Sequence, residues 1–243
     1  MKLAFISSSQ YKPIQRRRGF HMALAQYLLR DLAYYTMYKE LHEAGCFIIV
    51  DNGEAEGTRV DPQELVKVAT AIGADEIVVP DTLKNPYATL QAALTQQSAN
   101  TIPACKRLLV PQGTTWEEWE NCLDEMVALV DFATIGVAKH LEKLPDGRAH
   151  ALKYIREKDY TAHNIHLLGC YGNPLKEIRT ANKFRFVRSI DTGAPLALAQ
   201  NGIVIDGTYD KEEHHSLQHW LPADYEVVVQ NLKTLDEVAN GYL

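Results

Sequence analysis

A short apolar run recurs along this chain and ends each time in a polar residue or a glycine, which limits the folds available to it. Phe47–Asp51 is the clearest case, because four apolar residues precede a carboxylate and the turn signal Asn52-Gly53. The same pattern recurs in runs that end at Asp81, Gln112, Lys139, Gly169 and Asp191. We interpret these runs as buried strands of a parallel sheet, because parallel strands read as short continuous apolar segments.

Segments with helical spacing of apolar residues separate the strands, at roughly 30 residues per strand-helix unit, as in βαβ architectures. A chain of 243 residues has the usual size of one (β/α)8 barrel. We therefore predict a single α/β domain over residues 1–243, a TIM-like barrel without a zinc subdomain. Leu3–Ser9 is the expected first strand, and His21–Glu43 is expected to be helical throughout. The eighth strand is left open between Ala194–Ala199, Gly202–Ile205 and Glu226–Gln230.

Composition limits the class of protein and its partners. Hydrophobic residues make up 46% and charged residues 23% of the chain, which is typical of a soluble globular protein. No apolar run approaches the roughly 20 residues of a membrane span, so no membrane partner is expected. The four cysteines are scattered, with no Cys-x-x-Cys pair, which indicates reduced thiols in a cytoplasmic protein. Because the net charge is −6, nucleic-acid binding would need a local basic patch.

Polar residues at the ends of parallel strands converge on one mouth of a barrel, where active sites form. Two carboxylates, Asp51 and Asp191, suit cleavage of a glycosidic bond through a covalent intermediate. A third carboxylate, Asp81, with the amide of Gln112 suits the edge of a purine-like base. Any one of these aspartates could instead cap the helix that follows it.

The ordered motifs resemble those of the tRNA-guanine transglycosylase superfamily. The motifs are Asp51-Asn52-Gly53-Glu54, Val79-Pro80-Asp81-Thr82, Pro111-Gln112-Gly113, Ile135-Gly136-Val137-Ala138-Lys139, Leu167-Leu168-Gly169 and Ser189-Ile190-Asp191-Thr192. The zinc-binding cysteine motif and the RNA-binding domain of the tRNA enzymes have no counterpart here. The compact chain is therefore most similar to the phage-type members that act on DNA.

The resemblance implies a pentosyltransferase that exchanges guanine for a 7-deazaguanine such as 7-cyano-7-deazaguanine. It implies DNA as the preferred nucleic acid and tRNA as the alternative. Asp191 would be the nucleophile and Asp51 the acid–base residue, with no cofactor and no metal. The residues that would bind the base are Asn52, Asp81, Gln112, Gly136 and Gly169. Related barrels suggest a possible homodimer, and a phage-encoded enzyme would work in the host cytoplasm.

Two cationic runs are the candidates for phosphate contacts, because Lys and Arg near a reacting sugar would hold the backbone. They comprise Arg16, Arg17, Arg18, Lys183, Arg185 and Arg188. The alternative interpretation is that the residues of both runs are solvated surface cations that bind no phosphate. A histidine-rich segment, residues 212–219, has no standard metal-ligand spacing, so no metal is predicted.

Three other functions stay open. Lys139 at a strand end could form a Schiff base in an aldolase-type barrel. The same carboxylates could hydrolyse nucleosides with water as the acceptor. The barrel could also bind nucleic acid without catalysis.

Overall fold

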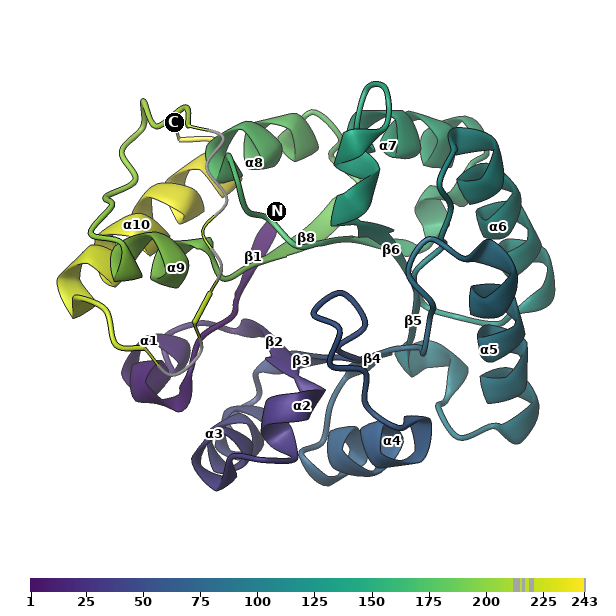
Figure 1. Cartoon of the computed structure of the whole chain (residues 1–243), viewed down its shortest axis with the longest axis horizontal. Helices are drawn as coiled ribbons and strands as arrows, with labels where there is room; N and C mark the ends of the chain where they lie inside the picture. Colours follow the sequence, from purple (N-terminus) through teal and green to yellow (C-terminus); the bar gives the residue numbers. More distant parts are fainter. Residues whose placement is uncertain (212–214, 216, 219–220, 243) are drawn as a thin grey trace.

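The computed structural model describes residues 1–211, 215, 217–218 and 221–242. In this part of the chain eight parallel strands pair in sequence order and close, with β1 paired to β8, into a barrel. Helices surround the barrel on all sides (Figure 1). The predicted (β/α)8 fold is therefore confirmed. None of the helices among the described residues is long and apolar enough to cross a membrane.

The strands are short, as expected from the lengths of the apolar runs. They are β1 Lys2–Phe5, β2 Phe20–Leu24, β3 Phe47–Asp51, β4 Glu76–Val78, β5 Arg107–Leu109, β6 Thr134–Ala138, β7 Asn164–Leu168 and β8 Val187–Thr192.

The helices lie between and after the strands. The α-helices are α1 Lys12–Gln15, α2 Ala25–Leu28, α3 Leu32–Glu43, α4 Pro62–Ala71, α5 Pro86–Ala99, α6 Trp116–Leu129, α7 Arg148–Glu157, α8 Pro174–Asn182, α9 Ala194–Gln200 and α10 Tyr225–Ala239. The 3-10 helices are η1 Ser9–Tyr11, η2 Ala104–Lys106, η3 Lys139–Lys143 and η4 Tyr160–Ala162.

Side-chain oxygens at the N-caps determine where several helices begin. The carboxylate of Asp61 accepts hydrogen bonds from the backbone N–H groups of Gln63 and Glu64, and Pro62 follows it at the first helical position. The Thr115 hydroxyl accepts from the N–H of Glu118 at the start of α6. The loops that lead from the strand ends to these caps lie at the carboxyl end of the barrel, beside the strand-end residues.

One strand lies where a helix was predicted. Phe20–Leu24 is β2, and the helical part of the predicted segment begins at Ala25. All five residues of β2 are buried, and the run merges into the helical pattern that follows, so its periodicity is masked. Two of the three proposed eighth strands lie in α9 and α10, and the third is coil.

The barrel interior is filled by side chains from alternate strand positions. Its middle is apolar, with Met22, Ile49, Val78 and Leu108 in one buried cluster. At the amino end of the barrel Arg188 pairs with Glu76 through two contacts of 2.6 and 2.7 Å. The guanidinium carbon of Arg188 also lies 5.5 Å from the ring centre of Phe20. This ion pair lies across the amino end of the barrel, and the cavity described below lies at the opposite end.

Gly136 makes the apolar packing possible. A Cβ at this position would lie 2.6 Å from Leu168 Cδ1 and 2.7 Å from Leu108 Cδ2. The glycine therefore belongs to the packed wall of the barrel.

We expect Gly136→Ala to lower the free energy of unfolding by about 1–3 kcal/mol, the usual cost of overpacking a core. Urea denaturation followed by circular dichroism measures this change. Gly19→Ala is the matched control, because a Cβ on Gly19 meets no atom within 4 Å. Equal stability of the two variants would contradict the packing role of Gly136.

Candidate active site

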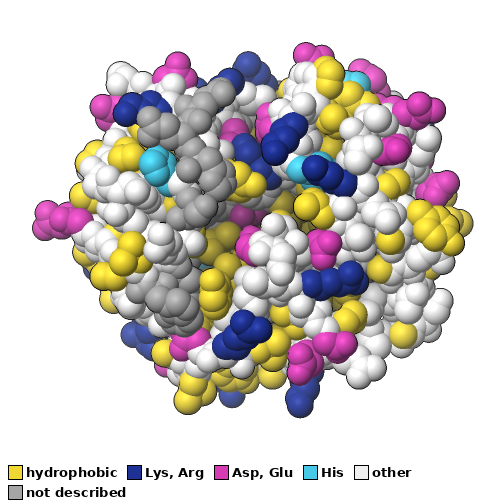
Figure 2. All heavy atoms as spheres, in the orientation of Figure 1, with side chains coloured by type: hydrophobic (Ala, Val, Ile, Leu, Met, Phe, Trp, Pro, Cys, Tyr) yellow, Lys and Arg dark blue, Asp and Glu magenta, His cyan; other side chains and the backbone are white. Residues whose placement is uncertain are grey.

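A cavity of about 440 Å³ opens at the carboxyl end of the barrel, above the apolar layer. Figure 2 shows this face hollowed near its centre, with acidic and hydrophobic side chains around the hollow. The loop between β3 and α4 contributes Glu54 and Glu56 to the cavity, and β6, β7 and β8 contribute residues at their ends. The cavity therefore combines an apolar base with a polar rim.

Asp191 is held in place by the strand beside it. Its Oδ1 accepts a hydrogen bond of 2.8 Å from the backbone N–H of Gly169 and lies 3.1 Å from Nε2 of His166. Nδ1 of His166 lies 2.8 Å from the hydroxyl of Ser189, so both ring nitrogens have partners. Gly169 has a φ of +74°, a conformation that favours glycine and that aims its N–H at the carboxylate. The Asp191 carboxylate, 5% exposed, is therefore fixed in orientation.

Asp51 lies at the end of β3 and is buried. Its Oδ2 accepts a hydrogen bond of 2.9 Å from the N–H of Gly53. Burial raises the pKa of this carboxyl well above its ordinary value, and the negative charges of Glu56 and Asp191 add to the effect. A carboxyl with a raised pKa is suited to accept and donate protons in acid–base chemistry.

Asp81 is bound by two amides. Asn52 Nδ2 donates to Oδ1 at 2.7 Å, and Gln112 Nε2 donates to Oδ2 at 2.5 Å. Burial raises the pKa of Asp81 to about 6, although both amide hydrogen bonds act in the opposite direction. The amide oxygens are also in use, since Gln112 Oε1 accepts from the N–H of Lys84 and Asn52 Oδ1 from that of Glu54. Asn52 and Gln112 thus fix the carboxylate of Asp81.

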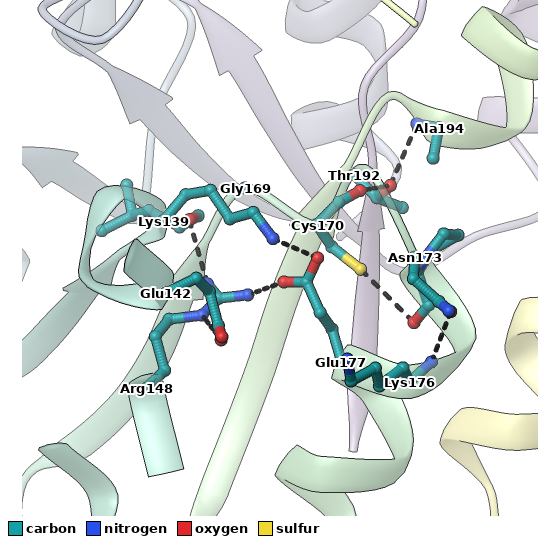
Figure 3. A network of polar contacts seen from close by, with 12 residues as sticks. Lys139, Glu142, Arg148, Gly169, Cys170, Asn173, Lys176, Glu177, Thr192 and Ala194 are labelled. Carbon is teal, nitrogen blue, oxygen red and sulfur yellow. Dashed lines mark hydrogen bonds and ion pairs between the residues drawn. The ribbon is translucent and has the colours of Figure 1, made fainter. Parts of the chain in front are cut away.

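Lys139 directly follows β6 and reaches a buried carboxylate (Figure 3). Its ammonium group pairs with Oε1 of Glu177, on α8, while Oε2 of the same carboxylate pairs with Arg148, on α7. The Nζ atom also lies 5.1 Å from the ring centre of Tyr171. Burial raises the pKa of Glu177, whereas the charge of Arg148 opposes that rise. Arg148 also contacts Oε1 of Glu142 at 3.1 Å, so two carboxylates accompany the two cations of this cluster.

The structure brings six of the predicted site residues to this cavity. They are Asp51, Asn52, Asp81, Gln112, Gly169 and Asp191. Gly136 does not line it, because it lies lower in the wall among Leu108, Val110 and Leu168. The chemical roles assigned to these residues stay predictions.

The predicted phosphate-binding cations lie at the other end of the barrel. Arg16 and Arg18 precede β2 and pair with Glu40 and Asp236. Lys183 and Arg185 precede β8, and Arg188 lies in the closed amino end. A strand of six residues spans about 20 Å, so proximity to Asp191 in sequence does not place these cations at the mouth. Contacts from Arg16, Arg17, Arg18, Lys183, Arg185 or Arg188 to nucleic acid stay a prediction without support from this arrangement.

Sequence reasoning missed three residues that shape the site. His166 points into the barrel beneath Asp191, and strand alternation two residues before Leu168 could have indicated it. Arg148 and Glu177 were missed because both lie in helices, 29 residues apart in sequence. No local pattern links such residues, which meet only when the barrel closes.

The described residues offer no metal site. Within them, no group of three or more His, Cys, Asp or Glu side chains could hold a metal ion. Most of the histidine-rich segment singled out in the sequence lies outside the described residues.

The chain matches no protein-family model, and no curated protein matches it. Its structure is similar to N-acetylneuraminate lyase from Mycoplasma synoviae, with a TM-score of 0.56 and 8% identity over 100% of this chain and 98% of that one. An HpcH/HpaI aldolase from Desulfitobacterium hafniense gives a TM-score of 0.56 at 9% identity, covering 83% of this chain and 89% of the other. Tryptophan synthase from M. tuberculosis gives 0.55 at 10% identity, over 99% and 91% of the two chains.

These findings correct the predicted family and enzyme class. Membership of the tRNA-guanine transglycosylase superfamily, and with it a pentosyltransferase, is wrong, because the similar structures are aldolase and lyase barrels. The identities of 8–10% show a shared fold. The short motifs misled because polar residues end the strands of any barrel with a site at its mouth. The expected DNA, tRNA and 7-deazaguanine partners rested on that resemblance and lose their support with it.

Asp81 gives a direct test of the site's electrostatics. We expect its carboxyl to titrate near pH 6, measured by the ¹³C shift of the side-chain carboxyl carbon. Asn52→Ala should raise this pKa further, because it removes a hydrogen bond to the ionised form. Asn201→Ala is the control, since that amide donates to Ala197 O outside the cavity. A lower or unchanged pKa of Asp81 in Asn52→Ala would contradict the hydrogen bond from Asn52 to the ionised Asp81 carboxylate.

Proposed function

We propose that the protein is an aldolase-type lyase in which Lys139 forms a Schiff base with a small carbonyl substrate. The observation that carries the proposal is the position of Lys139, directly after β6, on the cavity and with a side chain 19% exposed. An amine held in a partly water-excluded site, next to another cation, is the usual form of a Schiff-base lysine. The likeness in fold to N-acetylneuraminate lyase and the HpcH/HpaI aldolase supports this choice of reaction class.

Glu177 is the proposed proton acceptor for Lys139. The amine must be neutral to attack a carbonyl carbon, and Glu177, whose pKa burial raises, is the carboxylate in contact with it that could accept the ammonium proton. Proton transfer makes Glu177 neutral, and the buried Arg148 cation keeps Glu142 as its counter-ion. The neutral amine then adds to the carbonyl carbon, and loss of water gives an iminium.

Bond cleavage follows from the iminium. The bond that breaks joins the carbon next to the iminium carbon to the carbon that bears the hydroxyl group. Its electron pair moves toward the iminium to give an enamine, and the hydroxyl-bearing carbon leaves as a carbonyl. The hydroxyl proton passes to a carboxylate, for which Asp51 is the proposed acceptor. The resulting enamine takes up a proton, and hydrolysis of the iminium so formed releases the second product and Lys139.

Trapping with sodium borohydride tests this proposal. We expect a panel of small ketones, aldehydes and 2-oxo acids to contain compounds that add covalently to the protein on reduction, as seen in its intact mass. Lys139→Arg should reduce the adduct at least roughly tenfold, because arginine keeps the charge but cannot form a Schiff base. Lys143→Arg, on the same 3-10 helix η3, is the control and should react like the wild type. Equal trapping in all three proteins, or none in any, would overturn the proposal.

A second candidate function is hydrolysis of a glycosidic bond. Asp191 and Asp51 favour it, because one carboxylate is fixed by two donors while burial raises the pKa of the other. Such a division suits a nucleophile and a proton donor, with water as the final acceptor.

The two candidates depend on different residues. Release of p-nitrophenol from aryl glycosides, or of free base from nucleosides, measures the hydrolase reaction. If the hydrolase function is correct, Asp191→Ala abolishes release while Lys139→Arg retains it. Release that requires Lys139 and tolerates Asp191→Ala would exclude this mechanism.

A further inference from the structure

The cavity is strongly acidic. Its described lining includes Asp51, Glu54, Glu56, Asp81 and Asp191. Lys139 is the one lysine or arginine in that described lining, and its ammonium group forms an ion pair with Glu177. A bound molecule therefore meets an excess of carboxyl groups, and burial raises the pKa of Asp51, Glu56 and Asp81 among them.

Two of these carboxylates have an oxygen with no donor. Asp51 receives its hydrogen bond on Oδ2, and no described residue donates to Oδ1. Asp191 receives both of its contacts on Oδ1, and Oδ2 has no donor among the described residues. The two residues are 7% and 4% exposed. Neither oxygen is among the described buried side-chain atoms that lack a partner, so both are open to the cavity and can accept from donor groups of a ligand.

A metal ion does not fit this arrangement. In the described ranges no three carboxylate or imidazole groups converge as metal ligands. Asp81 already has a donor on each oxygen, so among the strand-end carboxylates Asp51 and Asp191 remain as acceptors for N–H groups. The remaining wall near them is apolar, with Met22, Leu24 and Val110. The ligand should therefore combine an apolar or planar body with a donor-rich cationic group.

We propose that the substrate of this cavity carries an amidinium, guanidinium or ammonium group, which Asp51 and Asp191 bind through their free carboxylate oxygens. This assignment rests on the proposed function only in taking the cavity as the substrate site. The substrate of the lyase is then a carbonyl compound with a cationic nitrogen group. Substrates whose only charge is a carboxylate are disfavoured, because like charges in a buried site repel.

Three nearly isosteric probes separate charge from shape: benzamidinium, benzamide and benzoate. We measure their binding to the whole protein by isothermal titration calorimetry at pH 8. Benzamidinium should bind at least roughly tenfold more tightly than benzamide, and benzoate should be weakest. Its affinity should rise with pH, because a carboxyl of raised pKa must lose its proton to bind a cation. Titrations in buffers with different ionisation enthalpies should show proton release on binding.

Variants assign the effect to the two carboxylates. Asp51→Asn and Asp191→Asn should each weaken benzamidinium at least roughly tenfold and leave benzamide within about twofold. Glu43→Gln removes an exposed carboxylate outside the cavity and should bind as the wild type does. If the Asp variants unfold, the pH dependence and proton release of the wild type decide alone. Absence of benzamidinium binding, equal affinity for benzamide, or unchanged binding in both folded Asp variants overturns the proposal.

The outcome is independent of Schiff-base chemistry, because benzamidinium has no carbonyl group. Lys139→Arg should retain benzamidinium binding. If the wild-type protein binds benzamidinium but forms no adduct with borohydride, the lyase function is refuted and the cationic substrate is not. If it forms the Lys139 adduct but does not bind benzamidinium, only the cationic substrate is refuted.

Discussion

Alternation of side chains along eight closed parallel strands is the constraint on which the rest of this structure depends. In a closed barrel each inward side chain lies at the amino end, in the middle or at the carboxyl end, and a shift of one residue would turn it outward. In β8 the alternation is interrupted, because the register shifts between the pairs Ile165–Val187 and His166–Ser189. Arg188 therefore lies at the amino end, and Asp191, three residues later, still reaches the cavity. In β3, Ile49 fills the apolar middle and Asp51 reaches the mouth. The charges of the chain are thereby separated, with the Arg188–Glu76 pair at one end and the acidic cavity at the other.

The buried carboxylate of Glu177 connects this barrel to its chemistry. It joins α8 to Arg148 on α7 and to Lys139 directly after β6, so that two consecutive strand-helix units, β6–α7 and β7–α8, meet at one group (Figure 3). Removing a partner from such a group leaves an uncompensated buried charge, which is strongly destabilising. Arg148 also pairs with Glu142, so the two cations and the two carboxylates of this cluster balance in charge. One interaction thus serves both stability and the proposed nucleophile.

Much of the fold could be predicted from the sequence, because seven apolar runs have the length and termination of buried strands. The remaining strand, β2 (Phe20–Leu24), could not be predicted, because it continues without a break into Ala25–Leu28 and all of its residues are buried. Strand-end reasoning placed Asp51, Asp81 and Asp191 at one cavity, where the structure also has them. The same reasoning could not predict the role of Glu177 or the location of the basic runs, because both depend on how the helices pack against the barrel. The family resemblance failed for a related reason, since strand-end motifs report the architecture rather than the reaction.

The acidity of the cavity and the position of Lys139 together define the central claim, a Schiff-base lyase for a cationic carbonyl substrate. A crystal structure of the protein reduced with borohydride in the presence of an amidino- or amino-substituted ketone tests it most directly. The account predicts continuous electron density from Nζ of Lys139 into the ligand, with the cationic group against Asp51 and Asp191. Density on another lysine, or a ligand whose charged group points away from both aspartates, would contradict it.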